Sequence, residues 1–253
     1  MKRLKIEGLN LDIKWKAKAL NYQQIEEDLR DREADLFLLP EMFATGFSME
    51  PEEIADRNEE SLAWMKKFAR EKNAAVCGSV SVEEQGKFYN RMYFIKPDAS
   101  FVKYDKTHLF SYSGEDKVYT PGNDRVVVEY LGVKILLQVC YDLRFPVFSR
   151  NRGDYDLAIY VANWPEKRVE AWEHLLKARA IENQAYVFGL NRIGTDGNNL
   201  LYRESSHCFF ADGSEVSEKT GNIISTEIDL EKLKDFRTQF RFLDDRDQFE
   251  IIV

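Results

Sequence analysis

The sequence is poor in the side chains that build disulfide frameworks and metal sites. It contains three cysteines (Cys77, Cys140 and Cys208) and three histidines among 253 residues. The cysteines are odd in number and widely spaced, which is typical of reduced thiols rather than of paired ones. No histidine stands at a metal-ligand spacing from another or from a cysteine, and the adjacent His207 and Cys208 face opposite sides of a strand. We therefore expect a cytoplasmic protein that binds no metal and no other cofactor.

The sequence also lacks long apolar runs and an excess of basic residues. No run approaches the roughly 18 apolar residues that a membrane-spanning helix needs, and no apolar segment follows the basic residues 1–3 as in a signal peptide. Lys plus Arg number 36 against 44 Asp plus Glu, a net charge of −8. An acidic chain is poorly suited to neutralising phosphates, so we expect neither a membrane nor a nucleic acid as partner. A small anionic substrate stays compatible, because one local arginine can bind a carboxylate.

Apolar periodicity predicts an α/β chain in which helices cover β-sheets. No linker or shift in composition divides the chain, and one α/β domain can reach this length. We expect a single domain over residues 1–253, with residues 240–253 as a C-terminal tail. Strands are predicted at 2–14, 35–39, 74–82, 88–96, 100–104, 125–130, 133–139, 155–162, 185–193, 205–211 and 223–228, and helices at 15–33, 58–72, 145–152, 169–185 and 230–236.

Residues 134–146 predict a buried strand that ends in a cysteine at a sharp turn. The largely apolar run at 135–139 is typical of a strand covered on both faces. Cys140 follows it, and Asp142 can cap the helical segment that comes next. Backbone N–H groups at a helix start favour negative charge, so this turn suits a nucleophilic thiol. A lone cysteine is more often a small core residue, and the assignment therefore depends on partners elsewhere in the chain.

Two charged residues also follow predicted strands directly. Glu41 comes after one apolar strand, and a carboxylate at the edge of the core can act as a general base. Lys106 comes after another, and an ammonium beside Cys140 could lower the pKa of the thiol and bind developing oxyanion charge. Either residue alone is more often an ordinary surface charge, but three such residues at three strand exits indicate a catalytic site. His108 leaves a Cys–His pair as a less well supported alternative.

Three stretches of the chain resemble the nitrilase (carbon–nitrogen hydrolase) superfamily. Residues 38–43 (LLPEMF) are similar to its glutamate motif, residues 104–110 (YDKTHLF) to its lysine motif and residues 139–146 (VCYDLRFP) to its cysteine motif. The order of the motifs also fits, and the resemblance covers about residues 1–240. Within the superfamily the chain resembles the omega-amidases through residues 140–151, 155–158 and 161–165.

The resemblance implies a fold, an assembly and roles for four side chains. The implied fold is an α-β-β-α sandwich, and two chains are expected to form a homodimer. Cys140 is implied to be the nucleophile, Glu41 the general base, Lys106 the oxyanion stabiliser and Glu115 a second glutamate of the site. His108 is then a structural residue.

The resemblance also implies a small-molecule amide as substrate. Omega-amidases are expected to hydrolyse 2-oxo dicarboxylate monoamides, such as 2-oxoglutaramate and 2-oxosuccinamate, to the oxo acid and ammonia through a cysteine thioester. Arg144 is a candidate for the substrate carboxylate, because a guanidinium can bind it through two bonds; at a helix start it can equally be salt-bridged within the protein. The other predicted substrate-binding residues are Tyr141, Asn163, Trp164 and Phe43, with Phe47 also at the mouth of the pocket.

Two other functions fit the sequence. Another amidase or an N-carbamoyl hydrolase of the same superfamily would share the chemistry and differ only in its pocket. A catalytically silent binding scaffold is less consistent with the sequence, because a scaffold needs none of Glu41, Lys106 and Cys140.

Overall fold

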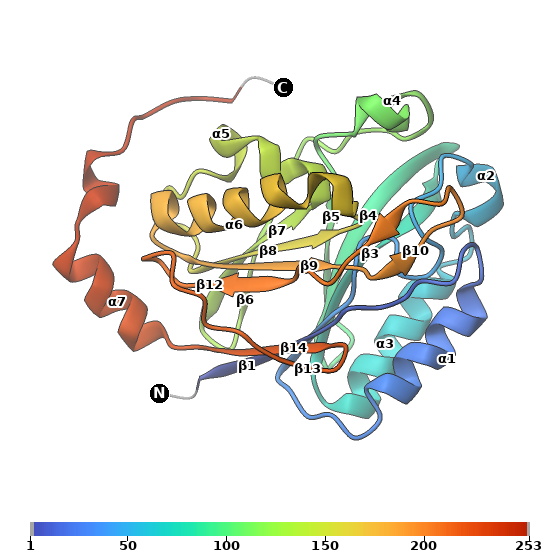
Figure 1. Ribbon diagram of the computed structural model, residues 1–253, viewed down its shortest axis with the longest axis horizontal. Coiled ribbons are helices and arrows are strands. Elements are labelled where there is room, and N and C mark those ends of the chain that lie inside the picture. The colour runs from blue at the N-terminus through green and yellow to red at the C-terminus, as the bar shows by residue number, and fades with distance from the viewer. Residues whose placement is uncertain (1–2, 252–253) are drawn as a thin grey trace.

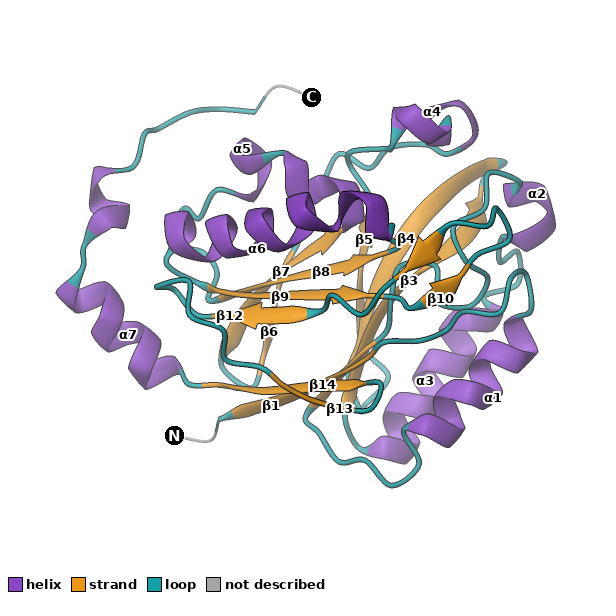
Figure 2. Ribbon diagram, viewed as in Figure 1, coloured by secondary structure: helices purple, strands orange, loops and turns teal. Residues whose placement is uncertain are grey.

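The protein is built from two β-sheets that lie face to face between two layers of helices (Figures 1 and 2). The computed structural model describes residues 3–251. The strands are β1 (Leu4–Leu9), β2 (Leu36–Leu38), β3 (Ala75–Glu84), β4 (Lys87–Ile95), β5 (Phe101–Asp105), β6 (Val127–Tyr130), β7 (Val133–Val139), β8 (Leu157–Ala162), β9 (Tyr186–Asn191), β10 (Gly194–Thr195), β11 (Leu201–Tyr202), β12 (His207–Phe209), β13 (Glu218–Thr220) and β14 (Ile223–Ile228). The α-helices are α1 (Lys18–Asp28), α2 (Pro51–Ile54), α3 (Glu60–Lys72), α4 (Glu115–Val118), α5 (Pro146–Ser149), α6 (Val169–Asn183) and α7 (Leu230–Gln239).

The two large sheets share one apolar core. The first has seven strands in the order β13-β14-β1-β2-β3-β4-β5, and the second has five in the order β12-β9-β8-β7-β6. Side chains alternate between the two faces of a strand, so Ile135 and Leu137 of β7 point into the layer between the sheets, where they join residues such as Phe94 from the first sheet. The residue between them, Leu136, packs on the opposite face. Strand β7 is therefore covered on both of its faces, as the apolar run at 135–139 predicts.

Helices cover the two outer faces. Apolar residues of α1 and α3, including Ile25 and Met65, pack with Phe37 and its neighbours on the seven-stranded sheet. Trp172 and Leu176 of α6 pack on the outer face of the five-stranded sheet, and Figure 1 shows α5 and α6 on that same side. These layers confirm the predicted α-β-β-α sandwich.

Strand exits gather the polar residues of the site. Strands β7 and β8 are parallel neighbours in one sheet, and β2 and β3 are parallel neighbours in the other. The carboxyl ends of β7, β8 and β2 lead into Cys140, Asn163 and the loop that carries Glu41, while β5 leads into Lys106. Ligands commonly bind at such ends of parallel strands.

Several boundaries differ from the prediction. The predicted strand over 2–14 is limited to β1, and residue 2 lies outside the described residues; the predicted helix over 15–33 is limited to α1. Instead of one helix over 145–152, the chain forms a 3₁₀ turn at Cys140–Arg144 followed by the single-turn α5. Within residues 3–251, no helix is long and apolar enough to cross a membrane.

Candidate active site

Cys140 occupies a tight turn at the end of β7. Its φ angle is +47°, in the left-handed region that residues other than glycine rarely adopt. This turn directs the chain from the strand into the 3₁₀ segment, and the side chain, which is partly exposed, lines a cavity. The thiol donates a long hydrogen bond to the carbonyl oxygen of Asn163, with 3.9 Å between sulfur and oxygen. Tyr141 is the second residue of this helical turn, and the first N–H groups of a helix have no acceptor within it.

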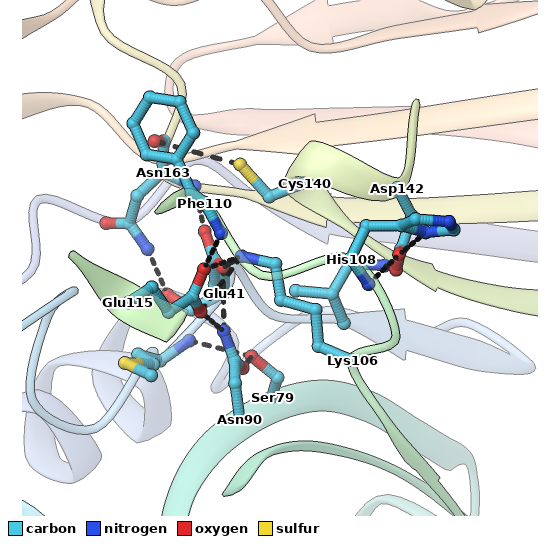
Figure 3. A network of polar contacts seen from close by, with 12 residues as sticks. Glu41, Ser79, Asn90, Lys106, His108, Phe110, Glu115, Cys140, Asp142 and Asn163 are labelled. Atoms are coloured by element: carbon cyan, nitrogen blue, oxygen red, sulfur yellow. Dashed lines mark hydrogen bonds and ion pairs between the residues drawn. The ribbon is translucent and has the colours of Figure 1, made fainter. Parts of the chain in front are cut away.

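A buried carboxylate fixes this turn to the lysine loop. Asp142 Oδ2 accepts hydrogen bonds from the backbone N–H of Val139 and from the hydroxyl of Tyr104, both at 2.8 Å. Its Oδ1 accepts one from the backbone N–H of His108 at 3.0 Å and lies 2.7 Å from His108 Nδ1. Asp142 thus holds the strand end before the cysteine as well as the loop after β5, rather than only capping the segment that follows it. His108 stacks on Phe145 with 3.9 Å between ring centroids and pairs with Asp142, away from the sulfur, in keeping with a structural residue (Figure 3).

Lys106 lies between two glutamates in the interior. Its Nζ is 2.9 Å from Glu41 Oε1 and 2.9 and 3.1 Å from the two carboxylate oxygens of Glu115. All three side chains are essentially inaccessible to solvent. Figure 3 shows this cluster beside the sulfur of Cys140. The structure therefore brings together the four side chains that the resemblance implies.

Neutral hydrogen-bond donors hold both glutamates in place. Asn90 Nδ2 donates to Glu41 Oε1 at 2.8 Å and to Glu115 Oε1 at 3.2 Å (Figure 3). The backbone N–H of Asn163 donates to Glu41 Oε2 at 2.9 Å, and that of Phe110 donates to Glu115 Oε2 at 2.5 Å. Each carboxylate is bound through both of its oxygens, which fixes its orientation. Asn90 lies within β4, and an asparagine inside a strand gives no signal in sequence that it faces a catalytic cluster.

The surroundings of Cys140 keep its thiol protonated. Burial and the negative charge of Glu41 raise the pKa of Cys140 well above its usual value, and the positive charge of Lys106 offsets them only in part. Burial lowers the pKa of Lys106, but the charges of Glu115 and Glu41 outweigh burial and raise it, so the amine is an ammonium. Burial also raises the pKa of Glu115 against the opposing effect of Lys106. Lys106 thus lowers the pKa of the thiol, as expected, but burial and Glu41 outweigh this effect, and two carboxylates already share the charge of the lysine.

A cavity of about 320 Å³ opens above the sulfur. Four of the predicted substrate-binding residues, Tyr141, Arg144, Asn163 and Trp164, line it. Within the described residues Arg144 forms no ion pair, and its guanidinium lies 5.1 Å from the ring centroid of Trp164. The other lining residues are Phe47, Met49, Lys106, Phe110, Ser113, Cys140, Pro165, Arg168, Asp196, Asn198, Leu200 and Tyr202.

Phe43 does not belong to the cavity, and this prediction is wrong. Its side chain is completely buried in the outer core, where it packs against Tyr22 and Trp64 on the helical side of the seven-stranded sheet. The reason is the left-handed φ angle of Met42 (+46°), which turns the chain directly after Glu41. Phe47, four residues further on, does line the cavity.

The sequence prediction missed Arg168, Asp196 and Tyr202. Arg168 stands four residues after Trp164, at the turn before α6. Asp196 and Tyr202 come from the loop around β10 and β11, where turn residues alone gave no indication of a binding site. Within residues 3–251, no group of three or more His, Cys, Asp or Glu side chains could hold a metal ion.

A thiol beside a Glu–Lys–Glu cluster in a four-layer sandwich defines a carbon–nitrogen hydrolase. The chain belongs to this family, since the carbon-nitrogen hydrolase family model matches residues 10–238. It is 41% identical to the omega-amidase YafV of Yersinia enterocolitica, with all of both chains covered. It is 31% identical to a 2-oxoglutaramate amidase of Bacillus subtilis, over 95% of this chain and 96% of that protein.

A solved structure agrees with these relatives. XC1258 from Xanthomonas campestris, a CN-hydrolase superfamily protein with an arsenic adduct in the active site, matches with a TM-score of 0.94 at 37% identity, covering 99% of this chain and 100% of that one. The superfamily and the fold predicted from the three motifs are therefore confirmed.

Cys140 is expected to be the first thiol that a small alkylating reagent modifies. Cys77 and Cys208 are fully buried, and burial raises the pKa of Cys208 to about 12. Cys140 lines the cavity and is the thiol beside Glu41, which can remove its proton. Peptide mass spectrometry after brief treatment with iodoacetamide measures the order, and earlier labelling of Cys77 or Cys208 in the folded protein would contradict the expectation.

Proposed function

We propose that this protein is an omega-amidase. It hydrolyses the terminal amide of small 2-oxo dicarboxylate monoamides, such as 2-oxoglutaramate, to the acid and ammonia through a cysteine thioester. The observation that carries the proposal is the Lys106 ammonium bonded to Glu41 and Glu115 beside a protonated thiol. The names of the relatives from Yersinia enterocolitica and Bacillus subtilis support the substrate class, and the unpaired Arg144 supports a substrate that carries a carboxylate.

Acylation begins with a proton transfer from Cys140 to Glu41. Since the thiol is protonated at neutral pH, a base must act as the sulfur attacks the amide carbon. The oxyanion that forms is held by Lys106 and by the backbone N–H of Tyr141. Glu41 loses negative charge when it takes the proton, so its hold on Lys106 weakens and an ammonium N–H can turn to the oxyanion. Each such donor is worth about 3–4 kcal/mol in the transition state.

The tetrahedral intermediate then collapses. The carbon–nitrogen bond breaks, Glu41 returns its proton to the leaving nitrogen, and ammonia departs from a thioester on Cys140. A water molecule, oriented by Glu115, attacks the thioester while Glu41 accepts one of its protons. The carbon–sulfur bond breaks, the sulfur regains the proton from Glu41, and the carboxylic acid leaves.

Glu41→Gln is expected to lower kcat for ammonia release by about 10³-fold or more, because loss of general acid–base catalysis alone costs about 10²–10⁴-fold. The variant should also lose about 1–3 kcal/mol of stability. The amide NH₂ of glutamine must face a donor, either Lys106 Nζ or the N–H of Asn163. Ammonia release and thermal unfolding measure the two effects. Glu129→Gln removes a charge from an exposed strand position and serves as the matched control; a Glu41→Gln enzyme with at least a tenth of the wild-type kcat would contradict the role of base.

A panel of amides tests the function itself. Wild-type protein should release ammonia from 2-oxoglutaramate and 2-oxosuccinamate with a far higher kcat/KM than from neutral amides or N-carbamoyl amino acids. Preference for an N-carbamoyl amino acid would assign the protein to another branch of the family. No ammonia from any member of the panel would favour a binding scaffold.

Assembly and location are proposed on the resemblance to the nitrilase superfamily. We propose that residues 1–253 form one domain, that two chains form a homodimer, and that the enzyme works in the cytoplasm on a small molecule rather than on a membrane or a nucleic acid. Val147 and Ile181 support an apolar interface, since they are 56% and 47% exposed. They belong to α5 and α6, two helices on the same side of the five-stranded sheet (Figure 1). Light scattering of the purified chain measures the assembly.

A further inference from the structure

Two arginines line the cavity above Cys140, and within residues 3–251 neither of them has a carboxylate partner. The guanidinium of Arg144 lies 5.1 Å from the ring centroid of Trp164, and that of Arg168 lies 5.2 Å from the ring centroid of Phe110. Both aromatic rings line the same cavity. Stacking on a ring holds a guanidinium in place but leaves the N–H groups along its edge free to bind a ligand.

Partly buried arginines elsewhere among residues 3–251 have acceptors within the protein, and Arg150 and Arg246 donate to backbone carbonyl oxygens. Arg91, Arg125 and Arg237 each form ion pairs with a carboxylate, whereas among residues 3–251 neither Arg144 nor Arg168 does. The acid that lines the cavity, Asp196, already accepts hydrogen bonds from the Tyr202 hydroxyl at 2.8 Å and from two backbone N–H groups at 2.8 and 2.9 Å. The lining thus holds two arginine cations against this one carboxylate, and the surplus of positive charge suits an anionic ligand.

Of the two, Arg168 is the more firmly placed. Arg144 is exposed, whereas Arg168 is half-buried at the end of a 3₁₀ turn. The backbone N–H of Arg168 donates to the carbonyl oxygen of Pro165 at 3.0 Å, and its own carbonyl oxygen accepts a hydrogen bond from Trp164 Nε1 at 2.7 Å. These two bonds tie the backbone of residue 168 to residues 164 and 165 within the short segment 163–168.

The same segment is bonded to the general base. The backbone N–H of Asn163 holds Glu41 Oε2, and the Asn163 side chain donates to the backbone carbonyl oxygen of Glu41 at 2.5 Å. Five residues later the chain presents Arg168 to the cavity. The place where the amide reacts and the place where a distant anion can bind are thus fixed relative to one another by one stretch of backbone.

We propose that Arg168 is the specificity-determining residue that binds the carboxylate at the non-reacting end of the substrate. Its planar edge donates two hydrogen bonds to that carboxylate, while the exposed Arg144 attracts the anion at the entrance. A neutral amide of equal length leaves the Arg168 donors unsatisfied, and a site built for a polar group rejects an analogue that lacks it. This inference rests on the proposed omega-amidase function and names the residue that gives that function its substrate preference.

The test compares kcat/KM for 2-oxoglutaramate with kcat/KM for pentanamide, a neutral amide with the same number of carbons. Arg168→Met is expected to reduce this ratio by about 100-fold, which corresponds to about 2.7 kcal/mol at 1.36 kcal/mol per tenfold, chiefly through KM. Arg168→Lys keeps the charge without the planar fork and should give an intermediate ratio. Lys167→Met removes the neighbouring exposed charge, which does not line the cavity, and should leave the ratio unchanged.

The result that overturns the inference is an Arg168→Met ratio within about threefold of wild type, or a larger fall in Arg144→Met than in Arg168→Met. Failure of the proposed function looks different, because wild-type protein would then show no preference for 2-oxoglutaramate over pentanamide. In that event calorimetric titration of Cys140→Ala with 2-oxoglutarate still decides the role of Arg168. Binding that the added Arg168→Met change weakens at least tenfold supports it, and binding that is absent or unaffected overturns it.

Discussion

Cys140→Ala is expected to lower ammonia release from 2-oxoglutaramate by at least about 10⁴-fold while the protein stays folded. Without the sulfur no thioester can form, and loss of a nucleophile typically costs about 10⁴–10⁶-fold in kcat. The fold should tolerate the change, because the side chain is partly exposed to the cavity and its hydrogen bond to the carbonyl oxygen of Asn163 is long. Ammonia release and the thermal midpoint measure the two expectations.

A control separates catalysis from stability in this experiment. Cys77→Ala removes a sulfur from the core between the sheets, where the residue is fully buried. That variant should unfold at a lower temperature than Cys140→Ala and yet retain most of its activity. If Cys140→Ala kept even one per cent of the wild-type kcat, the covalent route would be refuted.

Lys106→Met is expected to damage activity and stability together, which Cys140→Ala should not. Lys106 is the cation that Glu41 and Glu115 share in the interior. Removing one partner of a buried ion pair costs about 3–5 kcal/mol, because the remaining charge is left uncompensated. Loss of an oxyanion donor lowers kcat by a further 10²–10³-fold, in order of magnitude. Chemical denaturation near pH 7.5 and the ammonia assay measure these losses.

The stability of Lys106→Met should also acquire a characteristic pH dependence. Burial already raises the pKa of Glu115, and Lys106 opposes that shift. Without the lysine the folded-state pKa of Glu115 rises further above the unfolded value of about 4.3. The folded variant then binds more protons than the unfolded chain, so its stability is greatest at low pH and falls as the pH rises through that window. Lys117→Met, an exposed lysine on α4, is the control; a Lys106→Met protein as stable at pH 8 as at pH 5.5 would contradict the shared-cation description.

The positions of the proposed catalytic side chains can be predicted from the sequence more directly than the shape of the pocket can. Glu41, Lys106 and Cys140 each stand at the exit of a predicted strand, which indicates a shared site. That the exits of β2 and β5 in one sheet meet the exit of β7 in the other follows only from the packing of the two sheets. Asn90 is not predictable in this way, because only the pairing of β4 with β3 and β5 turns its amide towards two glutamates.

The incorrect prediction for Phe43 has a definite physical origin. An extended strand would place the side chains of residues 41 and 43 on the same side. The left-handed turn at Met42 interrupts this alternation. Glycine or asparagine at this position would predict such a turn from the sequence, whereas methionine does not. Arg168 could not be predicted either, because its position in the cavity depends on the hydrogen bonds of segment 163–168 and not on a sequence pattern.

The φ angle of Cys140 has a consequence for the evolution of the fold. Holding an L-amino acid in the left-handed region costs on the order of 1 kcal/mol or more, and glycine relieves that penalty. Selection for durability alone would therefore have replaced this residue with glycine. A protein that keeps cysteine there has a lower free energy of unfolding than its glycine variant would have. The same φ angle that places the thiol at the turn therefore lowers thermal stability.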